Sequence, residues 1–180
     1  MYFADMYCYG KDPTLVGITG FESCIGVIYV GNNDLYAVHI PFTKSMLDGA
    51  ARFAAFITAN GAKIDKAGFV GVFTNGTQRG GGVGAEAHLL RQNLGHPHTV
   101  LYRLKDVRTA AVYVERQASS NNVKMYVKDN NTVTWQDGGS PRSGCYDMKF
   151  SASFNDAKVP GTLHGFAEIT SANCDISDVS

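Results

Sequence analysis

Residues 24–40 have the sequence CIGVIYVGNNDLYAVHI, and this stretch decides the fold class. Its two halves, 24–31 and 35–40, are rich in β-branched and aromatic residues, as strands are. A Gly-Asn-Asn-Asp sequence at 31–34 separates them and favours a tight turn. The stretch therefore predicts a β-hairpin.

Strand and helix patterns surround this hairpin. Upstream, residues 14–20 form a short apolar run that ends at Gly20. Downstream, apolar residues recur every three or four positions from Leu47 to Ile57, which predicts an amphipathic helix from Thr43 to Asn60-Gly61. Further strands are predicted at 68–74, 99–104, 109–116, 123–128 and 131–136, and a second helix at 85–94.

The C-terminal quarter has weaker patterns. Asp129-Asn130 predicts a hairpin turn between the strands at 123–128 and 131–136. A loop is expected at 137–144 and edge strands at 146–153 and 163–169, while the polar last ten residues are expected to be loose. Taken together, residues 1–180 predict one α+β domain with a mostly antiparallel sheet and two main helices.

Composition excludes several classes of protein. Sixteen basic residues balance sixteen acidic ones, which argues against the basic excess of a nucleic-acid-binding domain. No apolar run approaches the roughly 18 residues that a membrane span needs. The N-terminal sequence MYFADMYCYG lacks the features of a signal peptide, so we expect a cytosolic protein or one exported without a cleaved signal. Four cysteines are too few for a disulfide scaffold, and we expect a chain without disulfides.

Cys24 and His39 are the candidate catalytic residues. A turn centred near residue 32 brings both to the open end of the hairpin, where we expect them to face each other directly. At that separation an imidazole can deprotonate a thiol, and the thiolate is a nucleophile. The loop before Cys24 is expected to leave the thiol reachable. The alternative is a buried structural cysteine beside a core histidine.

Other candidate sites are weaker. The glycines of 79–84 do not match a dinucleotide or P-loop pattern, and a flexible loop that borders the active site is the preferred interpretation. His96 and His98 have no obvious third metal ligand nearby, and we interpret them as part of a turn. The remaining cysteines have no histidine at useful spacing and are interpreted as structural: Cys8, Cys145 and Cys174. We therefore expect no metal and no cofactor.

The segment ITGFESCIGVIYVGNNDLYAVHIPFTKS, residues 18–45, resembles the catalytic segment of the cytotoxic necrotizing factor deamidases. It also resembles the chemoreceptor glutamine deamidase CheD, whose pattern is an upstream Thr, a Gly-Ser-Cys turn into a strand, and a His shortly before a Pro. Thr19, Ser23-Cys24 and His39-Ile40-Pro41 match these elements, whereas Glu22 replaces the glycine. The resemblance is specific over 14–45 and only architectural over 65–136.

This resemblance implies a mostly antiparallel or mixed β-sheet sandwich with two main helices. The catalytic core is expected at about 14–136, with 137–180 as an extension that recognises the substrate. Cys24 is expected to be the nucleophile and His39 the acid and base, and either Thr19 or a backbone carbonyl orients His39. Hydrolysis of a glutamine side chain through a thioester would yield Glu, and a primary amine in place of water would make the enzyme a transglutaminase.

The resemblance also suggests a biological setting. We expect a monomeric bacterial toxin or effector that stays in the bacterial cytoplasm until it is secreted or injected into a host cell. Its partner would be a protein that carries the target glutamine. One alternative is a deamidase of the bacterium's own chemoreceptors. Another is a non-catalytic binding domain that keeps the fold.

Overall fold

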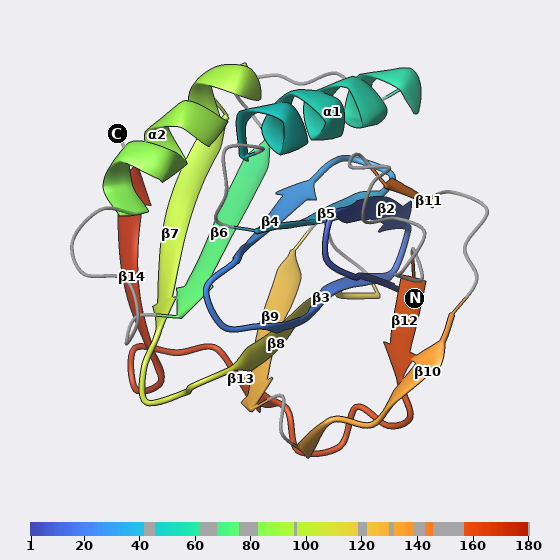
Figure 1. The fold of residues 1–180 in the computed structure, drawn as a ribbon, viewed down its shortest axis with the longest axis vertical. Helices are drawn as coiled ribbons and strands as arrows, with labels where there is room; N and C mark the ends of the chain where they lie inside the picture. The colour runs from blue at the N-terminus through green and yellow to red at the C-terminus, as the bar shows by residue number, and fades with distance from the viewer. Residues whose placement is uncertain are drawn as a thin grey trace.

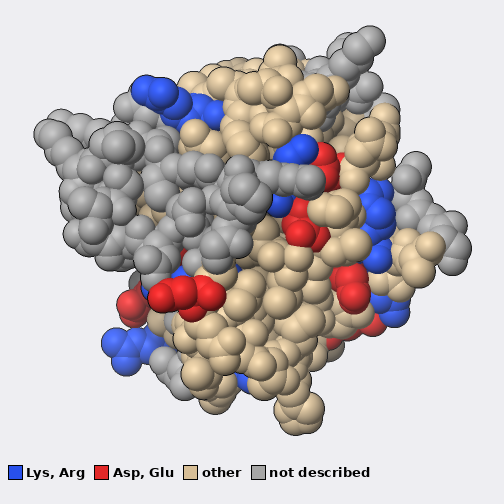
Figure 2. All heavy atoms as spheres, turned by 90° about the vertical axis from the view of Figure 1, so that its right-hand side faces the viewer, with Lys and Arg blue, Asp and Glu red and all other residues tan. Residues whose placement is uncertain are grey.

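A computed structural model describes residues 1–41, 46–61, 68–75, 83–95, 97–118, 122–129, 132–138, 143–145 and 157–179. Within these ranges the chain forms two seven-stranded sheets and two helices (Figure 1). Neither helix is long and apolar enough to span a membrane. On the face in Figure 2, acidic and basic side chains lie interspersed, in keeping with a formal net charge of zero.

The first sheet combines both ends of the chain. Strand β1 (Tyr2–Ala4) lies parallel to β3 (Leu15–Phe21) on one side and antiparallel to β12 (Ala157–Pro160) on the other. In spatial order the strands are β10 (Trp135–Asp137), β12 (Ala157–Pro160), β1 (Tyr2–Ala4), β3 (Leu15–Phe21), β8 (Ala110–Arg116), β9 (Val123–Asp129) and β13 (Ala167–Glu168).

The second sheet contains the predicted hairpin at its centre, as strands β4 and β5. In spatial order its strands are β11 (Ser143–Cys145), β2 (Cys8–Asp12), β5 (Leu35–Ile40), β4 (Ile25–Val30), β6 (Phe69–Asn75), β7 (His98–Leu104) and β14 (Cys174–Val179). Helices α1 (Met46–Ala59) and α2 (Val83–Asn93) cover one face of this sheet (Figure 1).

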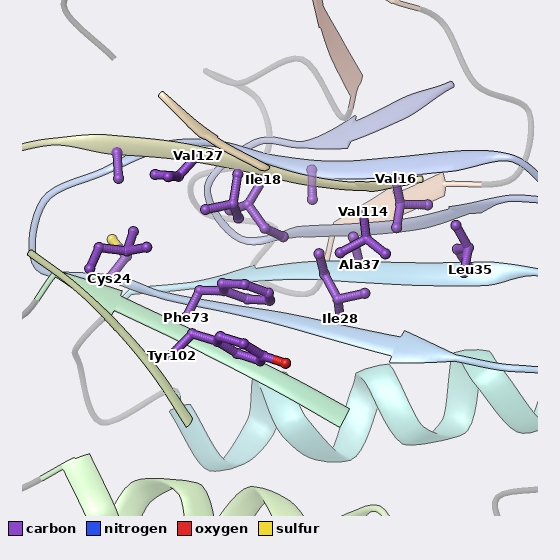
Figure 3. Close-up of a cluster of buried hydrophobic side chains, with 14 of the residues drawn as sticks. Val16, Ile18, Cys24, Ile28, Leu35, Ala37, Phe73, Tyr102, Val114 and Val127 are labelled. Carbon is purple, nitrogen blue, oxygen red and sulfur yellow. The ribbon is translucent and has the colours of Figure 1, made fainter. Parts of the chain in front are cut away.

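Successive side chains of the hairpin strands point to opposite faces of the sheet and so belong to two separate cores. Val27 and Val38 point toward the helices, where they join a cluster with Phe53. Ile28 and Ala37 point the other way, into the space between the two sheets (Figure 3). The hairpin therefore lies in the middle layer of the molecule, and both of its faces are buried.

The predicted class, a mostly antiparallel α+β sandwich with two helices, agrees with this architecture. Among the described strand pairs, only β1–β3 and β6–β7 run parallel. The prediction of a hairpin at 129–130 is wrong, because β10 pairs with β12 and β9 pairs with β8 and β13. Of the edge strand predicted at 163–169, only β13 forms, and the one at 146–153 lies outside the described residues.

The loose C-terminus is also a wrong prediction. Residues 174–179 form β14, which pairs with β7 along six residues and buries Cys174 and Val179. The strand has no apolar alternation because its outer positions face solvent and backbone pairing alone holds it at the edge. Residues 137–180 thus contribute β11, β12, β13 and β14 to the same two sheets.

The expectation of a chain without disulfides is wrong as well. Cys8 is disulfide-bonded, whereas Cys24 and Cys174 are buried thiols. Cys8 stands on β2 directly opposite Cys145 of β11 in the sheet register. The two positions are 137 apart in the sequence, so their opposition in the sheet depends on the pairing of two distant strands.

Candidate active site

The register of the hairpin fixes how Cys24 and His39 face each other. Val30 pairs with Leu35 across the turn, which places His39 directly opposite Gly26 rather than opposite Cys24. The predicted direct opposition is therefore wrong by two positions, because the turn is centred between residues 32 and 33. Continuing this register, Cys24 and His39 are diagonal neighbours on one face, where Cα atoms are roughly 7–8 Å apart.

Gly26 shapes the space between the two candidate residues. A Cβ atom at this position would lie 2.9 Å from Cγ1 of Ile18, which belongs to β3 in the other sheet. Only glycine lets the two sheets approach this closely without a shift of Ile18. The close approach carries β3, and with it Thr19, toward the hairpin.

Thr19 joins His39 across the gap between the sheets. Its hydroxyl Oγ1 lies 3.2 Å from Nδ1 of His39, and the contact is buried. Thr19 is 4% exposed and His39 is 1% exposed. The structure thus brings Thr19 and His39 into direct contact.

Burial determines the charge of His39. Desolvation lowers the pKa of the imidazole to about 4, and this effect outweighs two opposing influences, the negative charge of Asp5 and a hydrogen bond with the backbone of Ala4. At neutral pH the ring is therefore neutral and has one nitrogen able to accept a proton.

Cys24 is more enclosed than the sequence suggests. It immediately precedes β4 and belongs to the core cluster between the sheets, at one end of it in Figure 3. The side chain is 6% exposed, so the expectation of an openly reachable thiol is wrong for this conformation. The turn at 22–24 leads the chain inward, because Cys24 occupies an apolar position among residues such as Ile28 and Phe73.

Two residues that the sequence did not indicate complete the polar cluster. Asp5, directly after β1, accepts a hydrogen bond from the Thr19 hydroxyl at 3.0 Å. Lys158 of β12 forms an ion pair with the same carboxylate at 2.8 Å. No spacing rule joins positions 5, 19 and 158. They meet because β1 lies between β3 and β12.

The remaining candidates stay apart from this cluster. His98 is exposed on β7 and lies 3.6 Å from a carboxylate oxygen of Asp178. His96 and residues 76–82 of the glycine-rich segment lie outside the described residues. Burial raises the pKa of the Cys174 thiol to about 12, which makes it a poor nucleophile at neutral pH. Within the described ranges no group of three or more potential metal ligands occurs.

No family model, curated protein or solved structure matches this chain. The features that bear on function are the buried Thr19–His39 contact and the position of Cys24 on the same face of the sandwich.

Proposed function

We propose that the chain is a cysteine hydrolase that deamidates glutamine side chains of a protein, with Cys24 and His39 as the catalytic residues. The observation that carries this proposal is the 3.2 Å contact between the Thr19 hydroxyl and Nδ1 of His39, beside a cysteine on the same face. An imidazole oriented through one nitrogen, next to a thiol, is the arrangement that activates a cysteine nucleophile.

The first half of the reaction forms a thioester. Neutral His39 takes the proton of the Cys24 thiol, and the thiolate attacks the amide carbon of the glutamine side chain. The C–N bond then breaks as the imidazolium of His39 returns the proton to the leaving nitrogen, which departs as ammonia. Because burial gives this imidazolium a low pKa of about 4, it is a strong proton donor in this step.

The second half releases glutamate. His39 takes a proton from water, the hydroxide attacks the thioester carbon, and the C–S bond breaks to regenerate the Cys24 thiol. A primary amine in place of water would give a cross-linked product by the same route, so deamidase and transglutaminase activity share one intermediate. Neither step calls for a cofactor.

The resemblance over residues 18–45 supports this assignment, because the Thr, Cys and His positions of the CheD pattern fall on the residues that the fold gathers. We extend the proposal to the catalytic fold of the CheD and necrotizing factor deamidases and to a bacterial toxin or effector that acts on a host protein. A deamidase for the bacterium's own receptors would use the same residues.

A second candidate is a binding domain without catalysis. The burial of Cys24 favours it, since a thiol that is 6% exposed can serve simply as a core residue. The two candidates differ in the reactivity of the thiol. In a catalytic pair the imidazole raises the thiolate fraction, whereas a structural thiol in apolar surroundings reacts slowly.

Thiol reactivity is measured in a Cys174→Ser background, so that Cys24 is the thiol under test. We expect iodoacetamide at pH 7 to label this protein quickly and its His39→Asn variant slowly. Thr19→Val is expected to slow the reaction, and Thr19→Ser, which keeps the hydroxyl, to preserve it. Equally slow labelling of all four proteins would support the binding domain.

Deamidation itself is followed by mass spectrometry of host and bacterial lysates. Each converted glutamine gains about 1 Da as the amide becomes a carboxylate. We expect converted sites with the wild type and with Cys174→Ser, which removes the other buried thiol, but not with Cys24→Ser. Identical glutamine sites in all three samples would contradict the proposed function.

A further inference from the structure

Asp5 has the position of a residue that acts on His39 through Thr19. Its carboxylate Oδ1 lies 3.0 Å from the Thr19 hydroxyl, which in turn lies 3.2 Å from Nδ1 of His39. Asp5 is 7% exposed, so this chain of contacts is shielded from water along its whole length. Buried contacts of this kind are stronger than the same contacts at a surface.

The number of hydrogens in this chain determines which nitrogen of His39 carries a proton. A carboxylate has no hydrogen to donate, so Thr19 must donate its single hydroxyl hydrogen to Asp5. The hydroxyl oxygen can then act only as an acceptor toward Nδ1, and a hydrogen bond over this 3.2 Å contact requires Nδ1 to carry the ring hydrogen. Nε2 is left as the basic nitrogen, and this is the tautomer that a general base acting through Nε2 requires.

Asp5 is itself held firmly. Oδ1 also accepts a hydrogen bond from the backbone N–H of Met6 at 3.0 Å, and Oδ2 is paired with the Lys158 ammonium at 2.8 Å. The backbone carbonyl of Asp5 accepts from the N–H of Cys8 at 2.9 Å, which closes a tight turn after β1. These contacts fix the direction of the carboxylate.

The charge of Asp5 also suits the reaction. A negative charge near His39 favours the imidazolium and raises its pKa against the effect of burial. The imidazolium that forms when His39 takes a proton is thus stabilised by a carboxylate that it does not touch directly. The ion pair with Lys158 keeps this carboxylate in place.

We propose that Asp5, held by Lys158, is a positioning residue that fixes His39 in its Nδ1–H tautomer through the Thr19 hydroxyl. The effect of Asp5 on catalysis rests on the proposed function, whereas its effect on the tautomer of His39 does not depend on whether the chain is an enzyme. It also gives the C-terminal part of the chain a role at the site, because Lys158 belongs to β12.

The tautomer is measured by NMR of protein labelled with ¹⁵N-histidine at pH 7, with His39 assigned by comparison with His39→Asn. In the wild type we expect a protonated Nδ1 and an unprotonated Nε2. A protonated Nε2 in the wild type would overturn the inference without any further variant. In Asp5→Ala the Thr19 hydroxyl is released to donate to Nδ1, so a measurable Nε2–H population is expected.

A double-mutant comparison tests whether Asp5 acts through Thr19. Thr19→Val is expected to produce the same change as Asp5→Ala, and the double variant no more than either. The matched control is Asp12→Ala, because Asp12 also accepts from a threonine hydroxyl, that of Thr14, but on another strand. The control is expected to leave His39 unchanged, and an unchanged tautomer in Asp5→Ala would refute the inference.

Activity separates this inference from the proposed function. Loss of the correct tautomer costs roughly 10⁴-fold in a serine-protease triad, and we expect Asp5→Ala to lower kcat at least about tenfold with little change in KM. If the wild type does not deamidate but Asp5→Ala shifts the tautomer, the proposed function fails and the positioning role stands. If the wild type deamidates and Asp5→Ala changes neither the tautomer nor kcat, only the positioning role fails.

Discussion

Replacing His39 by Asn tests the burial that defines the site. In the folded chain desolvation lowers the pKa of His39 to about 4, whereas in an unfolded chain the imidazole has its ordinary pKa of 6.5. Between these values the unfolded state binds a proton that the folded state does not. The free energy of unfolding therefore falls as the pH decreases from 6.5 to 4, and the contribution of His39 is fully present only above 6.5.

The magnitude follows from the same two values. They differ by about 2.5, and each whole step in pKa corresponds to about 1.4 kcal/mol, so His39 costs the fold about 3 kcal/mol at pH 4 relative to pH 7. Asn is the matched replacement because its amide places a nitrogen near the position of Nδ1, where Thr19 is bound, and does not titrate in this range.

The measurement is urea unfolding followed by circular dichroism at several pH values from 7.5 to 4, under non-reducing conditions. We expect the wild type to lose about 3 kcal/mol more than His39→Asn over this range, with the difference concentrated between pH 6.5 and 4. Subtracting one curve from the other removes the contribution of carboxylates that titrate alike in both proteins. Parallel curves would refute the reasoning, because they would mean that His39 titrates normally in the folded chain.

Three further changes test the packing. Gly17→Ala would place a Cβ atom 2.2 Å from the ring of Phe3, which is fully buried, so we expect the free energy of unfolding to fall by about 1–3 kcal/mol. The control is Gly161→Ala, where the nearest neighbour of the new Cβ atom is a side-chain atom at 3.4 Å. Equal melting temperatures of the two variants would contradict this expectation. Cys8→Ser is expected to lower the free energy of unfolding by about 2–5 kcal/mol, because the disulfide is lost. If a reductant did not change the melting temperature of the wild type, the disulfide would not stabilise the fold. Deletion of residues 174–179 exposes the edge of β7 and is expected to cause aggregation in size-exclusion chromatography, whereas unaltered elution and melting would show that β14 is dispensable.

The elements that were predicted correctly share strong local patterns. The central hairpin, helix α1 and the strands β6 to β9 have apolar periodicity that the structure reproduces within one or two residues at most ends. Strands β1, β2 and β14 have only three to six residues each, and none was predicted. Strands this short form because a neighbouring backbone offers hydrogen bonds, and that neighbour is not visible in their own sequence.

The site divides in the same way. Cys24, His39 and Thr19 lie within 21 positions of one another on consecutive strands and their turns. The predicted hairpin therefore placed Cys24 and His39 close together. The direct pairing was nevertheless wrong by two positions, because strand register depends on the centre of the turn. Burial of the thiol was missed because exposure depends on the sheet that packs above the hairpin.

The sequence by itself determined the α+β class, the central hairpin and the three residues on which the proposed chemistry depends. These features are local, since periodicity and turn residues act over a few positions. Only the tertiary structure decided that Asp5 and Lys158 complete the cluster and that His39 is neutral. The cluster arises because β1 pairs with β3 and β12 in one sheet, which joins residues more than a hundred positions apart. The neutrality of His39 arises because that sheet packs on the other and removes water from around the ring.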